Sequence, residues 1–159
     1  MKNVPLAAIA AVLFFLFVPS VFSYPAGAFS LPEISGYTCG PLRSTPLSAP
    51  SGEFGNWLVR TYRGQGGRAF LATLISGPGA GPLVTPPGEI TSNDLPVGFG
   101  SVYEAFSLGD RDAVLENIPG VGLSLAVSLG RSGSLTLESP SLGRKELEEA
   151  AIRILKGQE

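Results

Sequence analysis

The chain has 159 residues, 44% of them hydrophobic and only 15% charged, with a formal net charge of −2. This balance excludes a disordered polymer, and the lack of a stripe of Lys and Arg excludes the electrostatic footprint of a nucleic-acid binder. The sequence contains no His, which removes the commonest general base and the commonest metal ligand. We therefore expect no metal, no cofactor and no enzymatic activity.

The first 28 residues have the pattern of a secretory signal peptide. Lys2 supplies a positive charge, and an unbroken apolar run follows from Leu6 to Val18. A run of this length is typical of a signal sequence and is too short for an ordinary membrane-spanning helix. The small residues beyond it predict cleavage after Ser23 or after Ala28. We expect an extracytoplasmic protein, periplasmic or secreted; the alternative is a membrane anchor formed by an uncleaved N-terminal segment.

Residues 29–52 are rich in Pro and Ser and predict an extended lead-in, part linker and part edge strand. The remainder, residues 53–159, is expected to form a single domain. It begins with two strands, 53–62 and 68–76, which form a hairpin around a glycine-rich turn. Apolar residues occur on both parities of this hairpin, so both of its faces need a cover. A helix can cover one face, and either the lead-in or a second protein can cover the other.

The Gly- and Pro-rich residues 77–88 predict a long loop, followed by one helical turn within 90–96. Alternating apolar residues then predict four further strands, at 100–108, 111–118, 122–129 and 133–139. The chain closes with a helix capped by Ser141, whose apolar face comprises Leu147, Ala151, Ile154 and Leu155. The predicted fold is α+β: an antiparallel β-sheet of about six strands with one C-terminal helix packed on one face.

Residues 115–129 carry the pattern Ile-Pro-Gly-Val-Gly, ending at Gly122, with Ala126 and Leu129 beyond it. This pattern resembles the hairpin of the helix-hairpin-helix family of sequence-independent DNA binders. The resemblance implies that the backbone N–H groups of Gly120 and Gly122 contact a phosphate. A Pro-Gly turn between two strands has the same residues, and the period of two after Gly122 favours it. We therefore expect the turn, and no nucleic-acid partner.

Cys39 is the only cysteine, so it cannot form an intramolecular disulfide. Because the chain has no His to activate the thiol as a nucleophile, we expect Cys39 to be a small, partly buried apolar residue. A disulfide to another molecule is the alternative.

The candidate binding site lies on and around the first hairpin and comprises Trp57, Arg60, Tyr62, Arg63 and Arg68. Arg and aromatic side chains are enriched at the centres of protein interfaces. The alternative is that the Arg stems merely lie over the strand ends. The favoured function is an exported non-enzymatic domain that binds a partner protein or envelope component, or associates with itself, through residues 53–76.

The alternative function is a small-ligand carrier. It would have a pocket between sheet and helix, with the Gly- and Pro-rich loop at its mouth. Three aromatic residues are expected to line such a pocket: Phe99, Tyr103 and Phe106.

Overall fold

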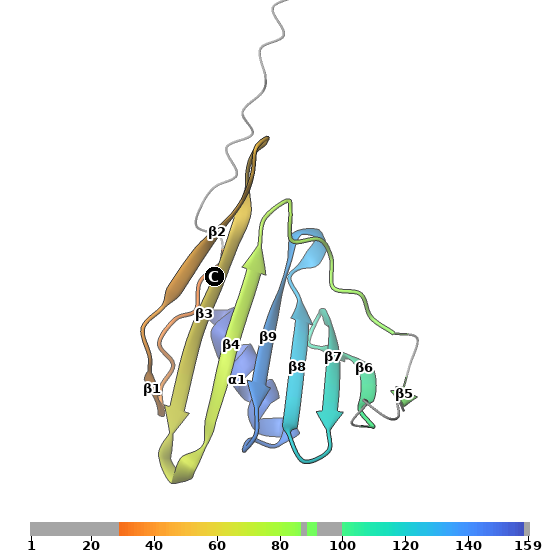
Figure 1. Ribbon diagram of the computed structural model, residues 1–159. Helices are drawn as coiled ribbons and strands as arrows, with labels where there is room; N and C mark the ends of the chain where they lie inside the picture. The colour runs from red at the N-terminus through yellow and green to blue at the C-terminus, as the bar shows by residue number, and fades with distance from the viewer. Residues whose placement is uncertain (1–28, 87–88, 92–99, 158–159) are drawn as a thin grey trace, which may run out of the picture.

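The computed structural model describes residues 29–86, 89–91 and 100–157. They form one antiparallel β-sheet and one α-helix, so the predicted α+β fold is confirmed (Figure 1). The nine strands run in the order β1-β3-β4-β9-β8-β7-β6-β5, and β2 also pairs with β3. The predicted signal peptide lies outside the described residues. Within the described ranges, the structure has no helix with the length and apolar character needed to cross a membrane.

The elements follow one another closely along the chain. The strands are β1 (Tyr37–Cys39), β2 (Arg43–Ala49), β3 (Gly52–Gly64), β4 (Ala69–Ser76), β5 (Glu89–Thr91), β6 (Val102–Leu108), β7 (Arg111–Ile118), β8 (Gly122–Ser128) and β9 (Gly133–Ser139). Two short 3₁₀ turns are η1 (Gln65–Gly67) and η2 (Gly130–Ser132), and the helix α1 spans Arg144–Lys156. The six expected strands agree with β3, β4 and β6–β9 within two residues at each end.

The structure adds three strands to the six expected. β1 and β2 come from the lead-in and pair side by side with β3, where Pro46 lies opposite Asn56. An edge strand tolerates Pro because one of its sides makes no ladder hydrogen bonds. β5 occupies Glu89–Thr91, where the helical turn within 90–96 was expected to begin, and pairs with β6. Residues 92–99 lie outside the described part of the chain.

One strand pair joins two locally connected halves of the sheet. β1–β4 form the first half, and β6–β9 form an up-and-down meander. The halves meet where β4 pairs with β9, with Leu74 opposite Leu135. The continuity of the sheet from one half to the other therefore depends on this non-local pairing.

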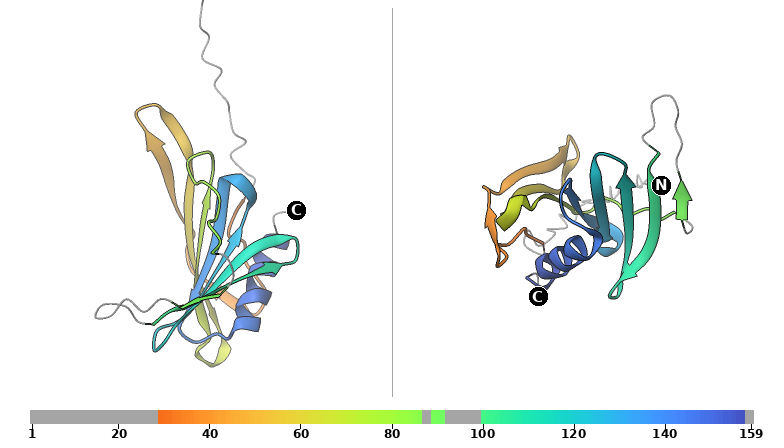
Figure 2. Two further views of the ribbon diagram at one scale, coloured as in Figure 1. Left: turned by 90° about the vertical axis from the view of Figure 1, so that its right-hand side faces the viewer. Right: turned by 90° about the horizontal axis from the view of Figure 1, so that it is seen from below.

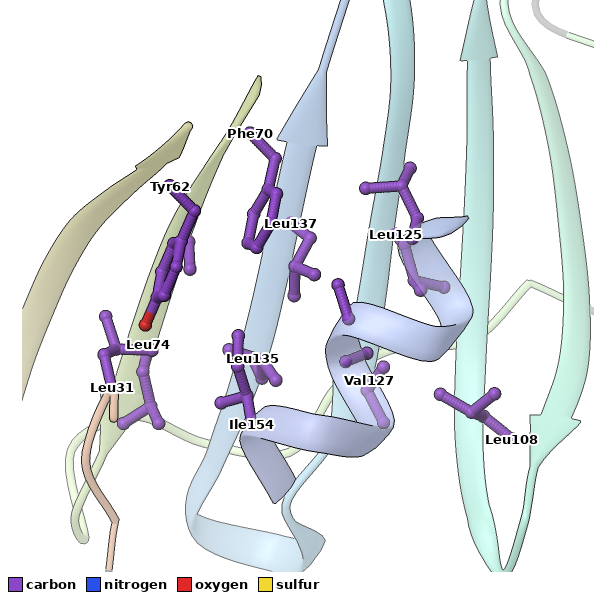
Figure 3. Packing of buried hydrophobic residues seen from close by; sticks show 14 of the residues in the cluster. Leu31, Tyr62, Phe70, Leu74, Leu108, Leu125, Val127, Leu135, Leu137 and Ile154 are labelled. Carbon is purple, nitrogen blue, oxygen red and sulfur yellow. The ribbon is translucent and has the colours of Figure 1, made fainter. Parts of the chain in front are cut away.

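α1 lies on one side of the sheet only, against β8 and β9 (Figure 2). The predicted apolar face is confirmed, since Leu147, Ala151 and Ile154 are fully buried. Leu155 packs against the same core from its margin. Figure 3 shows leucines of β4, β8 and β9 meeting the helix, and these side chains fill the space between helix and sheet.

The lead-in belongs to the same hydrophobic core. Leu31 is buried beside Tyr62 of β3 and the helix residue Ile154 (Figure 3), and Ile34 belongs to the same buried cluster. Pro32 lies against Gly157, directly after α1. The segment that precedes β1 therefore extends the cover that α1 provides, on the same face of the sheet.

Candidate binding face

The two faces of the sheet have different covers. Side chains at Leu58, Phe70 and Leu74 point toward α1 and are buried. Their neighbours along β3 and β4 point the other way. We call that second side the open face. The strand register aligns its side chains in three rows: Thr61, Leu71, Glu138, Ser124 and Glu116; Val59, Thr73, Thr136, Ala126 and Val114; and Trp57, Ile75, Ser134 and Ser128.

On the open face, the side chains of β3 and β4 are larger than those of β9 and β8. On this face β3 and β4 carry four large apolar side chains, Trp57, Val59, Leu71 and Ile75, together with Thr61 and Thr73, and Trp57 is 45% exposed. β9 and β8, next to them, carry short Ser, Thr and Ala side chains, with Glu138 as the exception. The result is a ridge along β3 and β4 beside a low floor along β9 and β8.

Two hollows lie on this face. The first, of about 560 Å³, is bounded on one side by Arg63 and Leu71 and on the other by Ile118 and Val121. The second, of about 470 Å³, lies where the loop after β4 passes over Val114, between the loop residues Leu83, Val84 and Pro86 and the strands. Ser124 lines both hollows, so they adjoin on the floor of the open face.

The charges of the open face are separated. Arg63 lies on β3 and Arg43 lies on β2 opposite Val59, whereas Glu138 and Glu116 lie on β9 and β7. Arg63 and Glu138 are exposed. None of these four side chains forms an ion pair within the described residues. The face therefore has a positive side and a negative side.

The structure divides the five candidate site residues between the two faces. Trp57 and Arg63 lie on the open face. Arg60 and Tyr62, which alternate with them along β3, point to the other side, where α1 and the lead-in lie. Arg68 lies beyond the end of β3 and forms an ion pair of 3.2 Å with Glu146 of α1. The five residues are not one surface.

Arg60 and Tyr62 hold the lead-in against the sheet. The Arg60 guanidinium donates to the carbonyl oxygens of Leu31 (2.8 Å) and Gly40 (2.9 Å) and contacts the Glu33 carboxylate at 3.3 Å. The Tyr62 hydroxyl donates to the Pro32 carbonyl oxygen at 2.8 Å. Arg60 is only 14% exposed, so its role here is structural.

Burial also controls the ionisation of Tyr62. Desolvation raises the pKa of Tyr62 to about 12, and the nearby Cys39 thiol adds to the rise. The Arg60 guanidinium opposes it by favouring the phenolate. Tyr62 stacks on Phe70, with ring centroids 4.6 Å apart. Tyr62 is a neutral, packed core residue.

The residues expected to line a carrier pocket do not face one another. Tyr103 lines the second hollow of the open face. Phe106, three residues later on β6, packs against the core, with the Arg144 guanidinium 4.6 Å above its ring. Phe99 lies outside the described residues. An odd spacing along a strand separates Tyr103 and Phe106 because successive side chains point to opposite faces.

The resemblance to the helix-hairpin-helix family is contradicted by the secondary structure. Residues 115–118 end strand β7 and residues 122–128 form β8, with the Val121 N–H bonded to the Ile118 carbonyl oxygen (3.0 Å) in the turn. A phosphate-binding hairpin of that family needs helices on both sides. The Pro-Gly turn between two strands is confirmed.

Two further features are Cys39 and the acidic side chains that could hold a metal. Cys39 is partly buried, with its sulfur 3.9 Å from the Tyr37 carbonyl oxygen. Among the residues that the structure describes, no three His, Cys, Asp or Glu side chains come together as a metal site.

The acidic half of the open face was not predicted from the sequence. The alternation along β8 and β9 marks one solvent-facing side of these strands, which contains Glu138. The missing information was the β4–β9 register, which places Glu138 opposite Leu71. No local pattern in the sequence encodes that register.

Comparisons with known proteins found no matching family model, curated protein or solved structure. Function is therefore inferred from the geometry of the open face.

Proposed function

We propose that this chain is an exported, non-enzymatic domain that binds a partner protein on the open face of its sheet. The single observation that carries the proposal is the ridge on β3 and β4. It presents Trp57, Val59, Leu71 and Ile75 on the side of the sheet that α1 and the lead-in do not cover. Export is supported by the signal-like residues 1–28.

The exposed part of the ridge is large enough to contribute to binding. An aromatic side chain carries about 150–250 Å² of surface, and burial stabilises by about 25 cal/mol per Å². Trp57 is 45% exposed, so covering the rest of its surface contributes roughly 2 kcal/mol. Aromatic residues beside Arg are also the side chains that dominate interface energetics.

The shape of the face favours a protein over a small molecule. The two hollows adjoin at Ser124 and open along a floor of short side chains. Small-molecule sites instead enclose most of the ligand surface. A carrier is the second candidate function, and the observation that favours it is the apolar hollow under Leu83, Val84 and Pro86.

The experiment is capture of partners from the native cell envelope by the tagged mature domain. Leu71→Arg and Trp57→Ala should each reduce the captured protein at least tenfold, because both change the ridge. Lys145→Glu, an exposed position on α1, is the matched control and should capture as the wild type does. Arg60→Glu is unsuitable as a binding variant because Arg60 holds the lead-in. Equal capture by the wild type and the three variants would contradict the proposal.

Export has its own test. N-terminal sequencing of the protein recovered from its own cells should find a chain that begins at Tyr24 or Phe29. A chain that still begins at Met1 in the membrane fraction would contradict cleavage and favour the anchored alternative.

A further inference from the structure

We propose that the partner of the open face is a second copy of this chain, bound face to face about a twofold axis parallel to the strands. The inference rests on the proposed function and specifies its partner. It is carried by two properties of one face: a ridge beside a floor, and a positive side beside a negative side. In both pairs, one half of the face is complementary to the other half: the ridge fits the floor, and the positive side attracts the negative side.

The first argument is shape. A twofold axis that runs along the boundary between β4 and β9 keeps the direction of the strands and exchanges the two sides of the face. The β3–β4 ridge of one copy then lies over the β9–β8 floor of the other, where the side chains are Ser, Thr and Ala. Packed sheets lie about 10 Å apart, which requires large side chains to meet small ones. An axis across the strands would set ridge against ridge.

The second argument is charge. The same axis keeps each residue at its own level along the strands. Arg63 and Glu138 both lie at the end of the sheet that holds the first hollow. Arg63 of one copy therefore comes over Glu138 and Glu116 of the other, twice per dimer. Both carboxylates lack an ion-pair partner within the described part of the chain.

The third argument is area. The face runs from β3 across β4, β9 and β8 to β7, where the loop residues 83–86 lie over the strand, and is about 24 Å wide. Seven residues of a strand are about 24 Å long, which gives a footprint of roughly 600 Å² per copy. Stable interfaces bury about 800 Å² per partner, with a range that begins near 600 Å². The footprint therefore reaches the lower end of this range, and a twofold interface uses the same patch on both copies.

The experiment measures mass by sedimentation velocity as a function of concentration. The wild-type mature domain should form a dimer. Arg63→Glu sets carboxylate against carboxylate at both contacts of the dimer, and Glu138→Arg sets guanidinium against guanidinium there. Each single variant should therefore raise the dimer dissociation constant at least about 100-fold, because like charges in contact cost several kcal/mol. Lys145→Glu should leave it unchanged.

The decisive measurement uses a mixture of the Arg63→Glu and Glu138→Arg variants. In a mixed dimer, the two introduced side chains meet at one contact, and the unchanged Arg63 and Glu138 meet at the other. Both contacts are then attractive. Mixing Arg63→Glu with Glu138→Arg should restore the dimer, and the double variant should also dimerise. A monomeric wild type, or a mixture that stays monomeric, would overturn the inference.

The outcome also separates this inference from the proposed function. If the wild type is monomeric but Leu71→Arg still abolishes capture of an envelope protein, the self-association fails and the binding function stands. If the wild type is monomeric and capture is the same for every variant, both fail. A dimer that Lys145→Glu disrupts and Arg63→Glu does not would place the contact on α1 and overturn the inference as well.

Discussion

The two faces of the sheet are built from the same strands, yet they differ in what side chains do there. Toward α1, Leu74, Leu125, Leu135 and Leu137 are fully buried and packed together. On the open face, Leu71 and Ile75 are only half-buried, and short polar side chains occupy the centre. The first face stabilises the fold, and the second is available to a partner. A single β-hairpin can thus supply a buried core and an accessible surface, because its residues alternate between them.

The largest expected difference between the faces comes from two leucines of β4. Leu74→Ala leaves a cavity in the helix-side core and should cost about 2–5 kcal/mol in the free energy of unfolding. Leu71→Ala, three residues earlier on the open face, should cost less than about 1 kcal/mol because its site is already partly exposed to water. Urea denaturation of the mature domain at low concentration measures both. Equal losses would show that the two faces are covered alike.

The next largest effect is a loss of stability at alkaline pH, which originates on the helix side of the sheet. Tyr62, on the helix side, has a pKa of about 12 in the folded protein, against about 10 in an unfolded chain. Its contribution is complete below about pH 10. Between about pH 10 and 12 the unfolded chain releases the tyrosyl proton and the folded protein keeps it, so stability falls as pH rises, by about 2 kcal/mol.

Tyr62→Phe should remove this alkaline loss, although it also removes the hydrogen bond to Pro32. The measurement is urea unfolding at several pH values from about 8.5 to about 11.5, with wild type and variant compared at each. A variant that loses stability in this range as steeply as the wild type does would contradict the assignment to Tyr62.

A smaller effect comes from a matched pair of serines on β9. The Ser139 hydroxyl is buried, donates to the Ala69 carbonyl oxygen (2.6 Å) and accepts from the Leu142 N–H (2.8 Å). Ser139→Ala should cost about 1–2 kcal/mol because it leaves these backbone groups unpaired. Ser134→Ala, on the open face, should change stability by less than about 0.5 kcal/mol. Thermal unfolding of the two variants measures both losses. A larger loss for Ser134→Ala than for Ser139→Ala would contradict our assignment of the two faces.

The smallest effect concerns the exposed start of α1. A hydrogen bond from the Gly143 N–H lowers the pKa of Glu146, and a smaller contribution comes from the hydrogen bond that the Arg68 guanidinium donates. The carboxylate therefore contributes stability above pH 4.5, and this contribution is lost as the pH falls below that value. Glu146→Gln should slightly destabilise the protein at neutral pH and reduce its acid sensitivity, as followed by circular dichroism from about pH 7 to about pH 3. A variant as acid-sensitive as the wild type would disprove this contribution.

Much of the fold could be predicted because alternation and turn residues encode it locally. β7 begins and ends where the sequence indicated, and the helix buries the predicted face. The cap was different: Ser141 bonds to Ala69 of β4, and Glu146 accepts from the Gly143 N–H. β2 was harder to recognise since nearly all of its side chains are exposed, so no alternation of polarity marks it.

The candidate binding face was less predictable, for a different physical reason. Arg60 and Arg63 look alike in a sequence, but their parity along β3 sends one into the lead-in and the other to the open face. The two apolar parities of the first hairpin correctly indicated apolar side chains on both faces of the sheet. They did not tell which face the lead-in would take, and that depends on Leu31 and Ile34 packing beside α1.

Because β4 pairs with β9, the molecule can complete its fold only after the C-terminal strands and α1 are available. We expect the strands on either side of this junction to form early from local contacts. Leu31 and Ile154, however, share one core and come from opposite ends of the described chain. Such long-range closure is slow compared with hairpin formation. If the exported chain crosses the membrane from its N-terminus, the β3–β4 hairpin crosses before β9 and α1, with both of its apolar faces exposed to water. The interval before β9 and α1 arrive is when aggregation competes most strongly with folding.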